Sequence, residues 1–220
     1  MEVDGAQFSA TLQWWAGGLY ALALFVALRL APWRRLRGER LHVFLGTCVC
    51  LLLLWSLRIQ AMDGVYFHFL GVTSVTLIFG WSLAVVATSL ALLGVILNGA
   101  AHWNDFALNA LLAGVLPITL TQVVLVLVRS LLPRNFFIYV LVNGFLTGAL
   151  SALAAAYAAV GLLLASGAQG LPALQAILLP FFPLMFFPEG FINGWLMTVL
   201  VAFRPHWVYS FADEDYIHGK

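Results

Sequence analysis

A handful of polar side chains interrupt the long apolar stretches of this chain, and their chemistry gives the first indication of its function. His68 stands in YFHFLG, and Glu189 and Asn193 stand in FFPEGFING. Asn109 and Asn143 lie in two other apolar runs. Polar and ionisable groups inside membrane segments are costly, so they mark functional sites by default. These positions are therefore the first candidates for a binding site.

Glu189 is the only carboxylate deep inside an apolar stretch, and no lysine or arginine lies at comparable depth. A buried carboxylate must be paired, protonated or bound to a ligand. Two interpretations stay open. One is a metal-linked or proton-linked site, and the other is a structural carboxylate that accepts hydrogen bonds from backbone groups freed near a proline bend. Asn193 follows one helical turn later, so both side chains can face one cavity.

The composition indicates which solvent surrounds these residues. The chain is 63% hydrophobic and 9% charged, with a mean hydropathy of +1.00. Soluble domains carry about 25% charged residues, so this chain has too few charges to cover a water-facing surface. A spanning helix needs roughly 20 apolar residues, which predicts an all-α polytopic membrane protein with about seven transmembrane helices. Net charge is +1 and no long basic run occurs, so we expect no nucleic-acid partner.

Charges, prolines and glycines divide the chain into predicted spans. The stretch 65–97 is apolar for too long to be one span, and Gly80 with Trp81 offers the natural break. The result is a single transmembrane domain over residues 1–207, followed by a short cytoplasmic tail, 208–220, whose charges we expect to be solvated. The predicted spans are 12–30, 42–57, 65–80, 81–97, 106–128, 136–165 and 173–203.

The last predicted span differs from the others because it contains prolines. Pro180, Pro183 and Pro188 interrupt it shortly before Glu189. A proline within a span frees backbone carbonyl groups, which neighbouring helices or a cavity must satisfy. We therefore expect a bent or broken helix here.

Arginine placement predicts the orientation. The dense run PWRRLRGER at residues 32–40 assigns the first loop to the cytoplasm and the N-terminus to the outside. Seven spans then place Arg129, Arg134 and Arg204 in the cytoplasm too, and leave Arg58 alone in the outer loops. Only an odd number of spans places every arginine-rich loop on the cytoplasmic side.

This orientation brings several potential metal ligands to the outer side. His68 lies near the outer end of the third span, close to Asp63 in the loop before it. His102 lies in the other early outer loop, together with Asp105. Imidazole suits nickel, copper or zinc, so these side chains could capture a divalent cation that arrives from outside. No tight spacing motif joins them, and helix packing is the alternative role for His68.

Two further features concern partners and energy. Ala23, Ala27 and Ala31 lie four apart on the first span, and such small-residue stripes let helices approach closely, so we expect a partner subunit on this face. The chain has no phosphate-binding ATPase motif and no paired catalytic groups. We expect it not to be an enzyme and to carry no cofactor, so active transport would need a partner or an ion gradient.

Three segments resemble the CbiM/NikM-type substrate-specific components of energy-coupling factor (ECF) transporters, which import cobalt or nickel. The segments are LRIQAMDGVYFHFLGVTSVTLIFGW, FALNALLAGVLP and FPEGFINGWLMTVLVAFRPHW, in the family's order. The resemblance implies a multi-pass protein of the bacterial inner (plasma) membrane. It would bind its substrate outside and work with a transmembrane scaffold and ATPase subunits. His68 matches the family's metal-binding histidine, and Asn109 matches a polar position packed beneath that site.

The second residue departs from the family pattern. Cobalt and nickel members carry a histidine there, which completes a near-planar metal site with the free amine and the following amide. This chain has Glu2 instead. Either the Met1 amine, Glu2, Asp4 or His102 substitutes, or the substrate has changed, or transport has been lost. A non-transporting accessory or assembly subunit of another membrane complex is therefore the alternative function.

Overall fold

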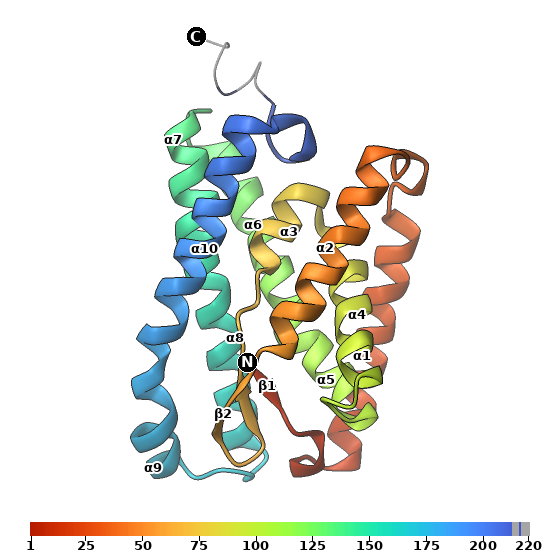
Figure 1. Ribbon diagram of the computed structural model, residues 1–220. Helices are drawn as coiled ribbons and strands as arrows, with labels where there is room; N and C mark the ends of the chain where they lie inside the picture. Colours follow the sequence, from red (N-terminus) through yellow and green to blue (C-terminus); the bar gives the residue numbers. More distant parts are fainter. Residues whose placement is uncertain (213–215, 217–220) are drawn as a thin grey trace.

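The structure, a computed structural model, describes residues 1–212 and 216, and it consists of upright helices packed around a short central one (Figure 1). Five apolar helical runs are long enough to cross a membrane among the described residues, and α4 (Trp81–Leu97) is a shorter apolar helix. The predicted all-α polytopic membrane fold is confirmed. The five runs are α1 (Ala10–Leu30), α2 (Glu39–Ser56), Trp103–Leu131 with α5 (Phe106–Asn109) and α6 (Leu116–Leu131), Phe136–Ala165 with α7 (Phe136–Ile138) and α8 (Thr147–Ala165), and Leu171–Phe203 with α9 (Leu171–Ala173) and α10 (Phe182–Phe203).

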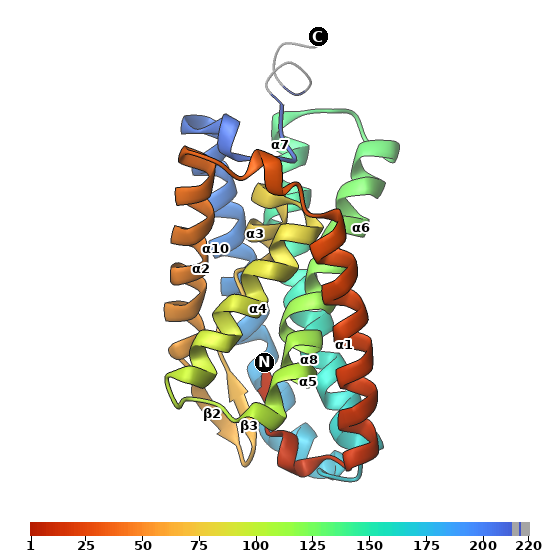
Figure 2. The ribbon, with the colours of Figure 1, turned by 90° about the vertical axis from the view of Figure 1, so that its right-hand side faces the viewer.

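A small antiparallel sheet, which the sequence analysis missed, closes one end of the bundle. Its strand order is β1 (Glu2–Val3), β3 (Val65–Phe67) and β2 (Ile59–Met62). Figure 2 shows the sheet at the end of the bundle opposite the C-terminal end of α10. We call the sheet end the outer end and the opposite end the inner end, following the predicted orientation.

The predicted third span, 65–80, is wrong as a continuous helix. Its first residues form β3, an extended stretch follows, and only eight residues form α3 (Val72–Phe79), every one of them buried. Gly71 and Gly80 bound α3 with φ values of +67° and +84°, which favour glycine because it lacks a Cβ atom. The extended stretch runs from the sheet into the middle of the bundle (Figure 1), so strand, extended chain and short helix together replace the expected span.

The last predicted span is a continuous helical run, Leu171–Phe203, whose first part is irregular. After α9, the chain makes a π-helical turn (Leu174–Leu178) and a 3-10 turn (Leu179–Phe181) before α10 begins. Pro188 lies inside α10, one residue before Glu189. This irregular backbone lies at the outer end, beside the sheet (Figure 1).

The chain that follows the helices is packed against the inner end. The backbone N–H groups of Tyr209 and Ser210 donate to the carbonyl oxygens of Ile78 and Leu77 at 3.0 and 3.1 Å. The predicted tail therefore begins as part of the bundle. Its acidic residues at 213–215 lie outside the described residues.

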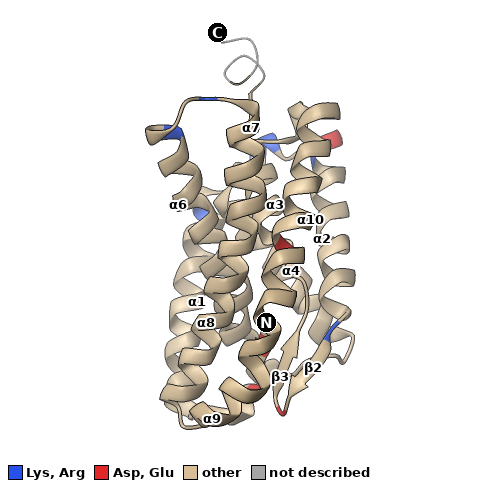
Figure 3. Cartoon of the chain, turned by 90° about the vertical axis from the view of Figure 1, so that its left-hand side faces the viewer, with Lys and Arg blue, Asp and Glu red and all other residues tan. Residues whose placement is uncertain are grey.

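Most of the arginines lie toward the inner end, whereas most of the acidic residues in the described part of the chain lie between the middle of the bundle and the outer end (Figure 3). The orientation of the bundle in the membrane stays a prediction. The arginine run at residues 32–40 joins α1 to α2 at the inner end.

Candidate functional site

The candidate site lies at the outer end, where β1 brings Glu2 against His68. The two side chains face each other, with Glu2 Oε1 3.6 Å from His68 Nε2. Both residues are buried, at 1% and 5% exposure. Neither of these two atoms has a hydrogen-bond partner within the described part of the chain. Unpartnered buried polar atoms are rare and need an explanation, such as an ion or ligand between them.

His68 is held so that its Nε2 atom is available. Its Nδ1 atom lies 3.0 Å from the carbonyl oxygen of Phe69, which can only accept a hydrogen bond. Nδ1 therefore carries the proton, and Nε2 presents a lone pair. Burial, followed by the charge of the N-terminal amine, lowers the pKa of His68 well below its ordinary value, so the ring is neutral. Trp55 packs beside it, with ring centroids 5.3 Å apart.

Glu2 is only partly neutralised. Its Oε2 atom accepts a hydrogen bond from Arg58 at 3.0 Å, and Arg58 also stacks on the ring of Tyr66. Burial raises the pKa of Glu2, while the N-terminal amine and Arg58 oppose that shift. One carboxylate oxygen thus serves the ion pair, and the other remains for a ligand.

The Met1 amine is a third potential ligand. Met1 is 1% exposed, and burial lowers the pKa of its amine to about 6. The amine is therefore mostly uncharged at neutral pH and can donate its lone pair. The nearby carboxylates of Glu2 and Glu189 oppose this lowering of the pKa of the amine, and Met1 lines the same cavity as His68 and Glu189.

Asn109 and Asp105 hold the N-terminal segment in this site. The Asn109 amide donates to the Val3 carbonyl oxygen and accepts from the Val3 N–H, both at 2.9 Å. Asp105 Oδ1 accepts from the Gly5 N–H at 2.8 Å. The register places Glu2 opposite Tyr66 of β3, and Tyr66 precedes His68 by two residues. Asn109 therefore positions the site through the backbone of β1.

Glu189 and Asn193 form a separate arrangement on α10. Glu189 Oε2 and Oε1 accept from the N–H groups of Leu70 and Gly71 at 2.9 and 2.6 Å. Asn193 donates to Glu189 Oε1 and accepts from the N–H of Ser74, both at 2.8 Å. These bonds satisfy the N-terminal end of α3, whose first N–H groups have no partner within the helix. The geometry favours the structural interpretation of Glu189, with the backbone groups coming from α3 rather than from the proline bend.

Comparison with known families identifies the architecture. Residues 8–207 match the CbiM family, described as the cobalt uptake substrate-specific transmembrane region. The chain belongs to the CbiM family. A crystal structure of a transition metal transporter has the same fold, with a TM-score of 0.72 at 17% identity over 92% of this chain and 93% of that chain. No curated protein gave a match.

This CbiM-family chain does not gather all the predicted ligands in one place. His102 is exposed and, with Glu2, lines a polar cavity of about 70 Å³ at the outer end, whereas His68 does not line that cavity. No group of three His, Cys, Asp or Glu side chains converges as a metal site within residues 1–212 and 216. The candidate site therefore consists of two side chains and the amine.

The expected partner stripe on α1 needs correction. Ala27 and Ala31 are 0% and 8% exposed and belong to the hydrophobic core of this chain, and Ala23 is half-buried. α1 packs against α4. The small residues therefore allow close packing within the bundle and are not open to another subunit in this structure.

The pairing of Glu2 with His68 is the part of the site that sequence reasoning missed. Two signals pointed toward it. Glu2 stands where the family has a histidine, and Arg58 was the only basic residue left outside. Neither signal showed that β1 would pair with β3 and bury the carboxylate beside the ring.

Proposed function

We propose that this chain is the substrate-binding membrane component of an ECF-type importer for a divalent transition-metal cation, similar to cobalt or nickel. The ligands would be Glu2, His68 and the Met1 amine. The observation that carries the proposal is the buried pair of unpartnered atoms, Glu2 Oε1 and His68 Nε2, 3.6 Å apart. Membership of the cobalt-uptake family supports it.

The spacing of the pair suits a metal ion. Two ligand atoms that each lie about 2.1 Å from a metal are separated by about 3.4 Å at the tetrahedral angle and by about 3.0 Å at a right angle. The observed 3.6 Å lies near the tetrahedral value. A carboxylate in place of the family's histidine supplies an oxygen ligand, which weakens the preference for square-planar nickel, an ion that favours a set of nitrogen ligands.

Transport would depend on partner subunits. The sequence contains no ATPase motif, so energy would come from ECF scaffold and ATPase subunits in the inner (plasma) membrane. The scaffold contact would use lipid-facing surfaces other than the Ala27 stripe, because that stripe is buried.

One observation favours the alternative, a non-transporting accessory or assembly subunit of another membrane complex. Arg58 already pairs with Glu2 and competes with a cation for its charge. Copurification with ECF ATPases would support the importer. A stable complex that lacks those ATPases would support the accessory subunit.

The direct test is metal analysis of the protein, affinity-purified from membranes of cells supplied with cobalt, nickel and zinc. Wild-type protein should retain about one equivalent of metal, as expected for one site, and His68→Ala should lose most of it. His206→Ala is the matched control, because His206 is an exposed histidine at the inner end. Equal metal contents in wild type and His68→Ala would refute the metal site.

A further inference from the structure

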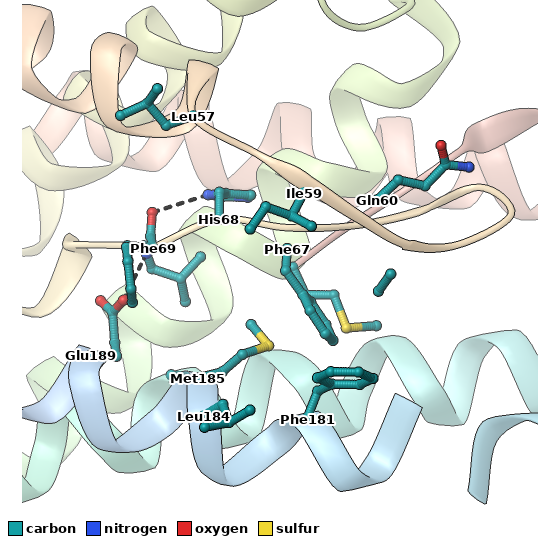
Figure 4. Close-up of a pocket in the computed structure, with 14 residues that line it drawn as sticks. Leu57, Ile59, Gln60, Phe67, His68, Phe69, Phe181, Leu184, Met185 and Glu189 are labelled. Carbon is teal, nitrogen blue, oxygen red and sulfur yellow. Dashed lines mark hydrogen bonds between the residues drawn. The ribbon is translucent and has the colours of Figure 1, made fainter. Parts of the chain in front are cut away.

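A cavity of about 350 Å³ lies between the β2–β3 hairpin and the outer part of the last helical run. Figure 4 shows Phe67 and Ile59 on the hairpin side and Phe181, Leu184 and Met185 on the opposite side. The cavity is several times larger than the polar cavity beside Glu2 and far larger than a single metal ion needs. Its volume falls in the range of roughly 300–1,000 Å³ that organic ligands occupy.

The walls of the cavity are almost entirely apolar. The exceptions among the lining residues are Gln60, His68 and Glu189. Both oxygens of Glu189 already accept hydrogen bonds from backbone N–H groups. A buried water needs two to four polar partners, and most of this wall consists of apolar side chains that offer none. An uncharged hydrocarbon therefore fits the cavity better than water or an ion does.

The rim of the cavity continues into the lipid-facing surface of the protein. Leu57, Ile59 and Leu184 line the cavity and are 76%, 75% and 69% exposed. On the neighbouring helices, Leu53 of α2 and Phe187 of α10 are also exposed. In a multi-pass membrane protein, such apolar side chains face lipid rather than water. The cavity thus opens sideways toward the bilayer.

We propose that this cavity binds one acyl chain of a membrane phospholipid from the leaflet on the outer side. The acyl chain enters between the hairpin and α10 and packs against Phe67 and Met185, and the headgroup of the lipid stays near the exposed Gln60. Met1 also lines the cavity, so the bound acyl chain packs against the N-terminal segment from the cavity side. This inference does not rest on metal transport.

Photo-crosslinking in nanodiscs tests the proposal. The full chain is reconstituted in palmitoyl-oleoyl phosphatidylethanolamine and phosphatidylglycerol, with a trace of phosphatidylcholine that carries a diazirine on one acyl chain, and a chelator keeps metal away. After irradiation, mass spectrometry should find several-fold more label on peptides containing Phe181 and Met185 than at Phe203. Phe203 is an exposed residue of the same helical run outside the cavity.

Variants that fill the cavity provide the second measurement. Ala152→Phe from α8 and Ala61→Phe from the hairpin place a ring inside it, and each should reduce the label to the level at Phe203. Ala61 is only half-buried, so its variant covers the case in which Ala152→Phe does not fold. Ala21→Phe, on an exposed position of α1 away from the cavity, should leave the label unchanged. Even labelling of all lipid-facing residues, or label that persists in the well-folded Ala61→Phe variant, would overturn the proposal.

Discussion

Among the residues that the structure describes, the two buried glutamates, Glu2 and Glu189, are held in opposite ways. Both oxygens of Glu189 accept hydrogen bonds, from the N–H groups of Leu70 and Gly71 and from the Asn193 amide. Glu2 pairs one oxygen with Arg58, and its other oxygen has no hydrogen-bond partner among the described residues. A carboxylate whose oxygens both accept hydrogen bonds from the protein can stabilise the fold, whereas one with an unpartnered oxygen can bind a ligand.

The difference follows from what surrounds each carboxylate. α3 begins inside the bundle, where no bulk water reaches its first N–H groups, and a buried unpaired N–H is costly. Asn193 supplies an acceptor for Ser74 in this first turn, and Glu189 supplies acceptors for Leu70 and Gly71, which lead into it. Ser210 acts at the other end, where its N–H and hydroxyl both donate to the Leu77 carbonyl oxygen. Burial alone therefore does not distinguish a carboxylate whose oxygens accept hydrogen bonds from one with an available oxygen.

The largest effect should come from Glu189→Ala. This change leaves the N–H groups of Leu70 and Gly71 without acceptors, whereas the Asn193 amide keeps its hydrogen bond to the backbone carbonyl oxygen of residue 189. Each unsatisfied buried group costs about 1–3 kcal/mol, so the variant should lose most of its folded population. The yield of monodisperse protein in size-exclusion chromatography measures the loss. Glu39→Ala, at an exposed inner-end glutamate, is the control.

If the Glu189→Ala protein is well folded but has lost its metal, the contrast drawn between Glu189 and Glu2 would be wrong. That result would make Glu189 a ligand rather than a structural acceptor. The melting temperature and the metal content must therefore be measured on the same sample.

Glu2→Gln should have the complementary effect. The amide keeps the shape of the side chain and the strand pairing of β1, but it removes the negative charge that faces His68. We expect metal retention to fall strongly while the melting temperature changes little. Glu39→Gln serves as the control for loss of one acidic charge. Loss of folding in Glu2→Gln, with metal retained in whatever remains folded, would assign Glu2 a structural role.

Lowering the pH should release metal from the candidate site of Glu2, His68 and the Met1 amine, and this effect should be more gradual than that of the substitutions. The Met1 amine has a pKa of about 6, so it is neutral above that pH and protonated below it, and the raised pKa of Glu2 acts in the same direction. Protons therefore compete with the cation as pH falls. Metal retention, measured after dialysis at a series of pH values, should be stable near pH 7.5 and decline through about pH 6. Retention that rises as the pH falls would contradict the amine and carboxylate as ligands.

The sequence by itself determined the membrane class, the break at Gly80, the irregular last span and the family resemblance. These properties depend on local composition and on the residues that disrupt helices. The stripe of Ala23, Ala27 and Ala31 shows what local sequence patterns do not determine, namely the partner of a helix face. Small residues at helical spacing predict a close contact, but Ala27 meets this chain's own core rather than another subunit.

Only the tertiary structure decided which polar residues form the site. Glu2 reaches His68 because β1 pairs with β3, and Asn109 holds that strand from another helix. The hydrogen bonds of Glu189 to Leu70 and Gly71, just before α3, favour a structural role for it. These contacts join segments far apart in the chain, and packing fixes them. Hydropathy and spacing along the sequence report only what each segment can do alone.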